Sequence, residues 1–164
     1  MTRKLFLLAT AFMSLTLIFS FSYKAANFAG TWNLDESASE LGQFGARAAS
    51  SKIVIEQTAE AFKMIRSNTG FDGSAADVTE NYTVGKDTEN TGLMNSKKTG
   101  KLSWDGEQSF KVEFTLSMEF GGQSFEMKGN EKWEISADGK SMTLKTNLST
   151  PQGDIETKAV YKKG

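Results

Sequence analysis

The stretch FKVEFTLSMEF, residues 110–120, alternates between apolar and polar side chains along its whole length. Because successive side chains of a β-strand point to opposite faces, this alternation predicts a strand with one apolar face. That face holds Phe110, Val112, Phe114, Leu116, Met118 and Phe120. Its eleven residues would span roughly 37 Å, about twice the length of a usual strand. Strands of this length are typical of a small barrel that curls around its own interior.

A glycine pair, Gly121-Gly122, follows this strand and tolerates the positive φ angles of a tight hairpin. Joining Phe120 to Gln123 fixes the register of the next strand, and a slip of one residue would turn its apolar residues to the other face. The register pairs Met118 with Phe125, Leu116 with Met127, Phe114 with Gly129, Val112 with Glu131, and Phe110 with Trp133. We expect the Phe114 ring to lie across the glycine backbone opposite it.

Alternating or β-branched runs between turn residues predict nine strands in total. They cover residues 28–34, 52–58, 62–68, 78–84, 96–104, 109–120, 123–136, 141–149 and 155–162. No sustained helical period competes, although a short helical turn is expected around 37–41 in the long segment 35–51. The sequence therefore predicts an all-β domain, an antiparallel up-and-down meander that closes into a barrel of roughly 8–10 strands.

The first residues have the layout of a secretory signal peptide. Arg3 and Lys4 precede an uncharged apolar run, residues 5–21, and small residues follow it. We expect removal of residues 1–22, with a cut as late as 26 as the alternative, which leaves 27–164 as the barrel domain. An uncleaved N-terminal anchor is the competing interpretation. The prediction is an exported protein, periplasmic or extracellular, with no stable membrane insertion after the signal is removed.

The chain contains no cysteine and no histidine. Disulfides, Ser-His-Asp and Cys-His nucleophiles, and the usual zinc sites are therefore excluded. We find no catalytic signature, cofactor motif or metal site and predict that the chain is not an enzyme; a carboxylate-only enzyme is the minor alternative. Loss of Arg3 and Lys4 from the 19 basic residues leaves 17 against 20 acidic ones, a net charge of −3. The densest basic cluster, residues 97–101, reads as a solvated hairpin edge, so no nucleic-acid partner is expected.

The segment FAGTW, residues 28–32, resembles the start of lipocalins, whose first strand carries Gly-x-Trp, here Gly30 and Trp32. Segment 35–51 stands where lipocalins have a lid loop, and the mature chain is similar to short exported bacterial lipocalin-like proteins of the calycin type. The resemblance implies a structural role for Gly30 and Trp32, with Trp32 closing the barrel floor. Lipocalins cover this tryptophan with a late arginine; here only the stem of Lys158 is available, because no arginine follows Arg66.

The resemblance also implies a protein that binds or carries a small hydrophobic molecule in the barrel interior. Arg66 and Glu131 fall on the apolar side of their strands, where a charge is costly unless it is paired or liganded. We hypothesise that they form an internal pair or anchor the polar end of a ligand. The alternatives are a bulge that turns Glu131 to solvent at the rim, or a pair with a purely structural role.

The other residues expected to line the cavity are Tyr82, Phe114, Leu116, Met118, Met127 and Trp133. The same residues are equally compatible with a filled core. In that case the chain would be a non-catalytic envelope interaction module, and its surface or lid loop would contact another protein. A lipid-facing wall is the third interpretation, and the short, mixed strands before residue 84 weigh against it.

Overall fold

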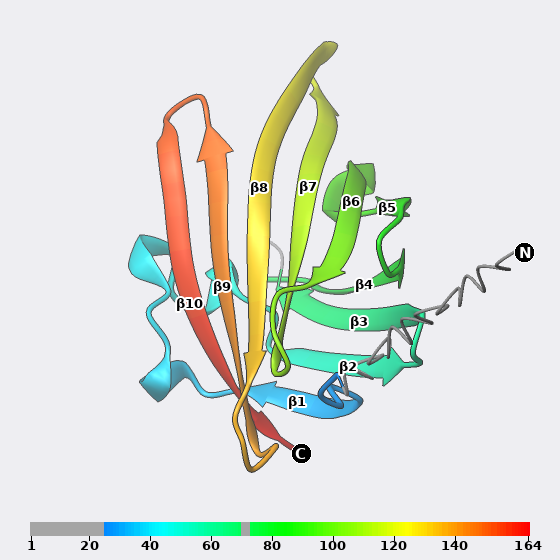
Figure 1. Cartoon of the computed structure of the whole chain (residues 1–164). Coiled ribbons are helices and arrows are strands. Elements are labelled where there is room, and N and C mark those ends of the chain that lie inside the picture. Colours follow the sequence, from blue (N-terminus) through cyan, green and yellow to red (C-terminus); the bar gives the residue numbers. More distant parts are fainter. Residues whose placement is uncertain (1–24, 70–72) are drawn as a thin grey trace, which may run out of the picture.

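Ten antiparallel strands form a nearly closed barrel (Figure 1). The computed structural model describes residues 25–69 and 73–164. The strands are β1 (Gly30–Leu34), β2 (Lys52–Gln57), β3 (Ala61–Thr69), β4 (Ala75–Thr83), β5 (Asp87–Thr91), β6 (Lys97–Trp104), β7 (Ser109–Phe120), β8 (Gln123–Ile135), β9 (Ser141–Thr150) and β10 (Gly153–Lys163). Three short 3-10 segments join them: η1 (Glu36–Ala38), η2 (Gly42–Ala48) and η3 (Leu93–Asn95).

The predicted signal peptide, residues 1–22, lies outside the described residues. Within 25–69 and 73–164, no helix combines the length and apolarity that crossing a bilayer requires.

The sheet is a meander in which the first and last strands of the chain pair with each other. Its order is β4-β3-β2-β1-β10-β9-β8-β7-β6-β5, so β1 and β10 pair and every other pair is adjacent in sequence. β2, β3 and β4 run across the lower part of the molecule, whereas β6 to β10 stand upright (Figure 1). The first and last strands of the order, β4 and β5, meet through one side chain. The Asn90 amide accepts from the backbone N–H of Asn81 at 2.7 Å and donates to its carbonyl at 3.2 Å.

The long hairpin has the predicted register throughout. β7 and β8 pair Phe120 with Gln123 and Phe110 with Trp133, and the connecting Gly121 and Gly122 have φ angles of 61° and 78°. A Cβ atom added to Gly129 would lie 2.6 Å from Cζ of Phe114, so the aromatic ring does cover the glycine. Only glycine permits this close approach of a ring to the backbone.

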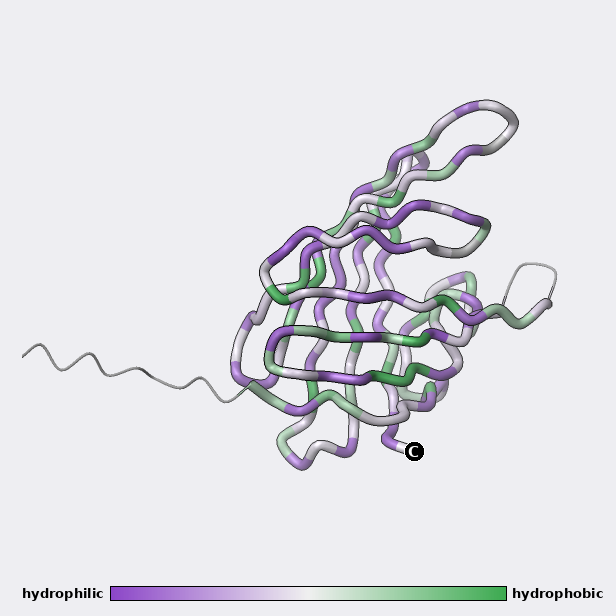
Figure 2. Tube along the Cα trace, turned by 90° about the vertical axis from the view of Figure 1, so that its right-hand side faces the viewer, coloured by the Kyte–Doolittle hydropathy of each residue, from purple (hydrophilic) through white to green (hydrophobic). Residues whose placement is uncertain are grey.

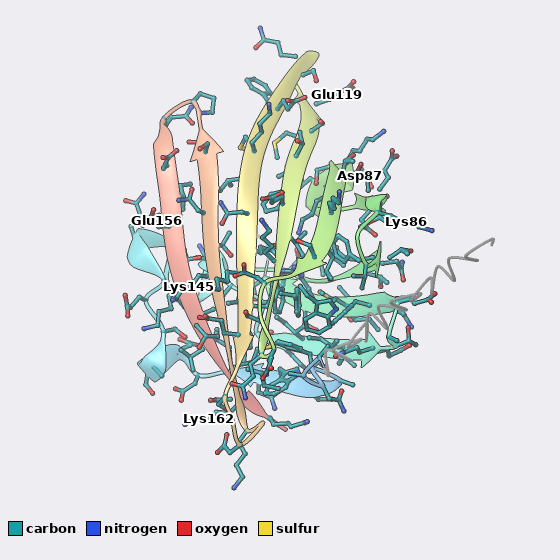
Figure 3. The ribbon with its side chains drawn as sticks, in the orientation of Figure 1. Lys86, Asp87, Glu119, Lys145, Glu156 and Lys162 are labelled. Carbon is teal, nitrogen blue, oxygen red and sulfur yellow. The ribbon has the colours of Figure 1, made fainter. Side chains whose placement is uncertain are left out.

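The apolar wall of β7 faces the inside of the barrel. Phe110 and Val112 are fully buried, whereas Lys111 and Glu113 form an ion pair on the outer surface. Charged side chains such as Lys145 and Glu156 likewise project from the outside of β9 and β10 (Figure 3). The chain therefore does not turn this wall outward, as a lipid-facing arrangement would require.

One strand has no counterpart among the nine predicted. β5 reads DTENT and pairs with β6 from Asp87 opposite Lys101 to Thr91 opposite Lys97. It contains no apolar residue, so alternation gives no signal for it. Backbone pairing and the Asn90 bridge hold it in place.

Five aromatic residues fill the lower end of the barrel and are called the aromatic base here. They are Phe28, Trp32, Phe62, Phe110 and Trp133, all at most 1% exposed. Phe110 stacks on Trp133 with ring centroids 5.4 Å apart, and it contacts Phe28 edge-on at 4.7 Å. Offset and edge-on ring contacts of this kind add to the free energy of burial. The base is therefore a packed aromatic core.

Trp32 is held in the base by a hydrogen bond from its Nε1 to the carbonyl of Phe28, 2.8 Å long. Lys163 places its Nζ 5.3 Å from the centroid of the Trp32 ring. Gly30 makes room for it, because a Cβ there would meet the Lys163 stem at 3.0 Å. The expectation for Lys158 was wrong: it lies on the outer face of β10 and pairs with Glu40 at 2.7 Å.

The segment between β1 and β2 runs along the edge of β10. The backbone of Glu40 exchanges two hydrogen bonds with that of Lys158, 2.7 and 2.9 Å long. Leu41 then packs into the core. The expected helical turn is present as η1, and η2 bends at Gly45, which has a φ of 56°.

The upper ends of β7–β8 and β9–β10 extend beyond the rest of the barrel (Figure 1). Figure 2 shows the topmost hairpin standing clear of the barrel body in a side view. β7 and β8 have 12 and 13 residues, whereas β1 and β5 have five each. The long strands therefore continue past the point where the short ones can cover them.

Candidate functional site

Two cations and two carboxylates form a buried ring above the aromatic base. This charged ring consists of Arg66 on β3, Glu80 on β4, Lys98 on β6 and Glu131 on β8, each at most 8% exposed. Arg66 Nη2 lies 2.6 Å from Glu131 and 2.9 Å from Glu80. Lys98 Nζ lies 2.9 Å from Glu80 and 3.0 Å from Glu131. Each charge thus contacts both charges of the opposite sign, and the formal charges cancel.

Two aromatic side chains complete the hydrogen bonds of the ring. The Tyr82 hydroxyl donates to Glu80 Oε2 at 3.1 Å, and Trp133 Nε1 donates to Glu131 Oε2 at 3.1 Å. The guanidinium of Arg66 also lies 4.9 Å from the centroid of the Trp133 ring. Buried charges are tolerated when they are paired and hydrogen-bonded in this way, and removing one partner leaves the others uncompensated.

Ion pairing keeps Arg66 and Glu131 charged despite their burial. Burial alone would raise the pKa of Glu131, but Arg66 and Lys98 lower it from 4.5 to about 2. Burial would lower the pKa of Arg66, but Glu131 and Glu80 raise it above its usual value. Burial and the adjacent carboxylates raise the pKa of Tyr82, so its hydroxyl stays protonated and remains a donor. The Arg66–Glu131 pair is therefore ionised at neutral pH.

Two buried donors near the ring have no hydrogen-bond acceptor among the described residues. They are the Nε–H of Arg66 and the hydroxyl of Tyr161 on β10. Burial raises the pKa of Tyr161 to about 12. Unsatisfied buried donors are uncommon in folded proteins and call for an acceptor.

The structure brings four of the predicted site residues into this layer: Arg66, Tyr82, Glu131 and Trp133. Glu131 faces inward in a regular strand, opposite Val112 on one side and Thr146 on the other, so the proposed bulge to solvent is wrong. The internal pair with Arg66 is formed. Whether it also serves a ligand stays a hypothesis.

Phe114 lies directly over the charged ring. Lys98 Nζ sits 4.5 Å from the centroid of its ring, and Phe114 itself is partly exposed. The lysine starts opposite Leu116 and extends past Phe114 to reach Glu131. Phe114 therefore separates the charges from the upper part of the barrel.

At the level of Phe114 and above it, the inward faces of the long strands remain apolar but are no longer covered. This surface, called the open end, comprises Leu116, Met118, Phe125, Met127, Leu148 and Ile155. These side chains are partly exposed, and Phe125 reaches 38%. Of the remaining predicted lining residues, Met118 and Met127 thus lie beyond Phe114 from the charged ring, whereas Leu116 lies opposite the backbone of Lys98.

Sequence reasoning missed Glu80 and Lys98. Glu80 carries the same signal that identified Glu131, because it shares a face with Val78 and Tyr82, two residues away on either side. For Lys98 the signal is weaker, because Ser96 and Gly100 are its nearest neighbours on that face and Leu102 is four residues away. The interpretation of residues 97–101 as a solvated edge is wrong for Lys98, although Lys97 and Lys101 are exposed. A cluster of lysines on one strand necessarily divides between two faces.

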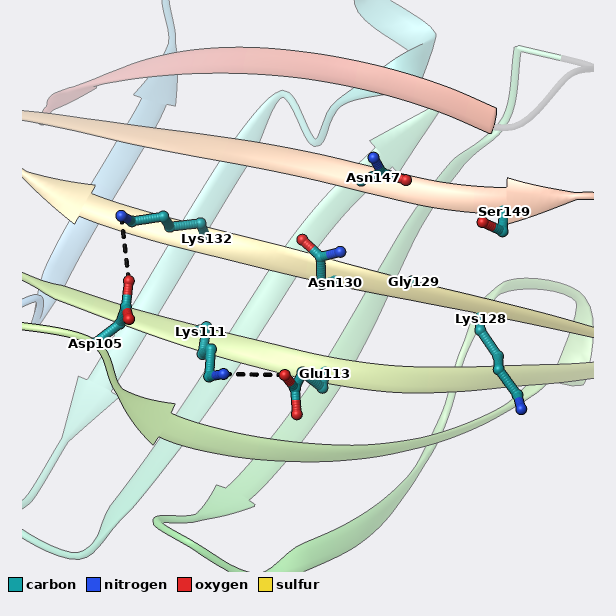
Figure 4. A pocket seen from close by; sticks show the side chains of 9 residues that line it. All are labelled: Asp105, Lys111, Glu113, Lys128, Gly129, Asn130, Lys132, Asn147 and Ser149. Carbon is teal, nitrogen blue, oxygen red and sulfur yellow. Dashed lines mark hydrogen bonds and ion pairs between the residues drawn. The ribbon is translucent and has the colours of Figure 1, made fainter. Parts of the chain in front are cut away.

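A hollow of about 440 Å³ on the outer surface, drawn in Figure 4, crosses β7, β8 and β9 and suits a hydrophobic ligand poorly. Its lining is rich in charged side chains, among which Lys111 pairs with Glu113 at 3.0 Å and Lys132 with Asp105 at 3.2 Å. Within 25–69 and 73–164, no three acidic side chains gather closely enough to hold a metal ion.

No family model matches the chain, and no curated protein matches it in sequence. Solved structures match it in fold. A protein described as the REP1-NXSQ fatty acid transporter superposes with a TM-score of 0.57 at 15% identity, covering 85% of this chain and 98% of its own. The zebrafish ileal bile acid-binding protein, solved with cholic acid, gives 0.55 at 19% identity, covering 84% of this chain and 98% of its own.

A point mutant of the same transporter gives a TM-score of 0.54 at 14% identity, covering 85% of this chain and all of its own length. Identities this low establish the fold alone. The chain shares the barrel fold of the fatty acid transporter and of the bile acid-binding protein. The expected barrel is therefore confirmed, at ten strands.

Proposed function

We propose that this protein binds a small hydrophobic molecule at the open end of its barrel, without catalysis. The observation that carries the proposal is the run of inward apolar side chains that stay partly exposed on β7 to β10. Contiguous exposed apolar surface is typical of interaction sites, and its burial would stabilise a complex by roughly 25 cal/mol per Å². The structural neighbours that bind fatty acids and bile acids support the same class of ligand.

The proposal also includes export, with residues 1–22 as a signal peptide, and a kinship with short exported bacterial lipocalin-like proteins. The basic start and the uncharged run 5–21 support export. The intact mass of the protein isolated from its native source tests this directly. We expect a mass that corresponds to a chain cut after one of residues 22–26. A mass that corresponds to a chain still containing residue 5 would contradict the proposal.

Binding is tested with the neutral dye Nile red, whose emission rises in an apolar site. Met118→Asp places a charge on the inward face of β7 and should weaken dye binding by about tenfold or more. Ser117→Asp is the matched control, because Ser117 is the adjacent residue on the opposite face. Met118 is partly exposed, so the variant keeps its fold. Equal dye affinity in the two variants would place the site elsewhere.

One observation favours the second candidate function, a non-catalytic interaction module. The aromatic base and the charged ring fill the barrel below Phe114, and the exposed Phe44 and Met94 offer contact points outside it. Absence of any dye binding by the wild-type protein would favour this module over a ligand carrier.

A further inference from the structure

The charged ring forms the inner boundary of the open end. A ligand that enters with its polar group first must bring that group toward Phe114 and the charges beneath it. What those charges can offer a ligand therefore decides which polar group fits.

Neither cation of the ring is free. Arg66 and Lys98 each contact both Glu80 and Glu131 at 2.6–3.0 Å, and all four side chains are buried. A ligand carboxylate at this level would add a third negative charge to a site whose formal charges already cancel. Transfer of an ion from water is unfavourable unless a counter-charge compensates it. The ring therefore disfavours an anionic head group.

Hydrogen-bonding groups that leave the charge balance unchanged are available at the same level. Thr146 lies opposite Glu131 on the adjacent strand and opposite Thr157 on β10, so both threonines lie on the inward face, and both residues are partly exposed. The buried Nε–H of Arg66 belongs to a guanidinium whose charge Glu80 and Glu131 already balance, and it has no acceptor among the described residues. Such groups satisfy a neutral oxygen acceptor without disturbing the charge balance.

We propose that the ligand of this protein is an amphiphile with an uncharged, oxygen-bearing head group, such as a long-chain alcohol or ester, and not a carboxylic acid. This inference rests on the proposed function and narrows its ligand class. It sets the chain apart from the fatty acid transporter and the cholic acid complex that share its fold.

Displacement of Nile red by matched twelve-carbon compounds tests the preference. Dodecan-1-ol and methyl dodecanoate should displace the dye at concentrations at least about tenfold lower than dodecanoate at about pH 8, where the acid is ionised. Dodecanoate binding as tightly as the alcohol would overturn the inference and leave the proposed function standing. Failure of all three compounds and the dye to bind would overturn both.

A second experiment distinguishes the effect of the charged ring on ligand preference from the general preference of apolar sites for neutral ligands. Glu80→Gln removes one negative charge, keeps the side-chain volume and keeps an acceptor for Tyr82. The surplus positive charge should then raise dodecanoate affinity by about tenfold, while dodecan-1-ol affinity changes by less than about twofold. Glu113→Gln, on the outer face of β7, is the matched control and should change neither.

Glu131→Gln makes the same charge change from the opposite side of the ring and serves if Glu80→Gln does not fold. Unchanged dodecanoate affinity in a folded ring variant would show that the ring does not select the head group. A rise in the Glu113→Gln control as large as that in the ring variant would assign the effect to overall charge and would also overturn the inference.

Discussion

The two ends of the β7–β8 hairpin share one alternating pattern and have opposite environments. Phe110 and Val112 are fully buried at the lower end, whereas Met118 is partly exposed and Phe125 is 38% exposed at the upper end. The lower residues are covered by Phe28, Phe62 and other core residues from β1 to β3. The short strands end before the upper residues are reached. Alternation thus specifies which face is apolar, and the lengths of the other strands decide how much of it is buried.

The largest expected effect tests the covered end. Phe110→Ala removes a ring that contacts Phe28, Phe62, Trp104 and Trp133. Because the surrounding barrel cannot collapse into the space, we expect the free energy of unfolding to fall by about 3–5 kcal/mol. Urea denaturation followed by circular dichroism measures it. A loss below about 1 kcal/mol would show that the base is not the core of the protein.

The charged ring lies between the two ends of the hairpin, and the dependence of stability on acid pH tests it. The folded-state pKa of Glu131 is lowered from 4.5 to about 2, so its ionised form contributes stability above pH 4.5. That contribution is lost as the pH falls from about 4.5 toward about 2. The difference in unfolding free energy between wild type and Glu131→Gln should therefore shrink across this window. A constant difference would contradict the ionised ring.

The seam between β4 and β5 gives a smaller effect. Asn90→Ala deletes both hydrogen bonds to the backbone of Asn81 and leaves that pair unsatisfied. We expect a loss of roughly 1–3 kcal/mol and faster hydrogen exchange at the Asn81 amide. Thr88→Ala on the same strand is the control. Unchanged exchange at Asn81 would mean that the seam is held by other contacts.

The smallest effect tests the uncovered end. Phe125→Ala also deletes a phenylalanine ring, but from a side chain that is 38% exposed. The free energy of unfolding should change by no more than about 0.5 kcal/mol in the same urea experiment. A loss comparable to that of Phe110→Ala would mean that the open end is covered in solution. The comparison on which the proposed site depends would then fail.

Much of the candidate site was readable from single strands. The alternation of side chains between the two faces of a strand was enough to place Arg66 and Glu131 on the inward face. The hairpin turn fixed which residues lie opposite one another. The same alternation applied to Glu80 and Lys98, but Glu80 was not singled out, and Lys98 stands in the basic cluster 97–101, which was interpreted as a solvated hairpin edge. What parity cannot supply is the partner of each charge, because the four ring residues come from four different strands.

β5 and Trp32 show a second limit of prediction from the sequence. The sequence DTENT shows no apolar–polar alternation, so nothing in it predicts a strand. The strand is held by backbone pairing with β6 and by the hydrogen bonds between its Asn90 and Asn81 on β4. The cation over Trp32 is Lys163, because Gly30 admits its stem, whereas Lys158 has the opposite parity and faces outward. Contacts across the barrel depend on where strands meet in space, which local pattern does not encode.

By itself the sequence determined that the chain is an antiparallel barrel, which face of its longest strands is apolar, and the register of its longest hairpin. These follow from the period of two along each strand and from turn chemistry, both of which are local. Only the tertiary structure decided that the interior charges balance in a closed ring and that the apolar wall is buried below Phe114 and open above it. Charge pairing and burial depend on side chains that are distant in sequence, and those distances are set by the closure of the whole sheet.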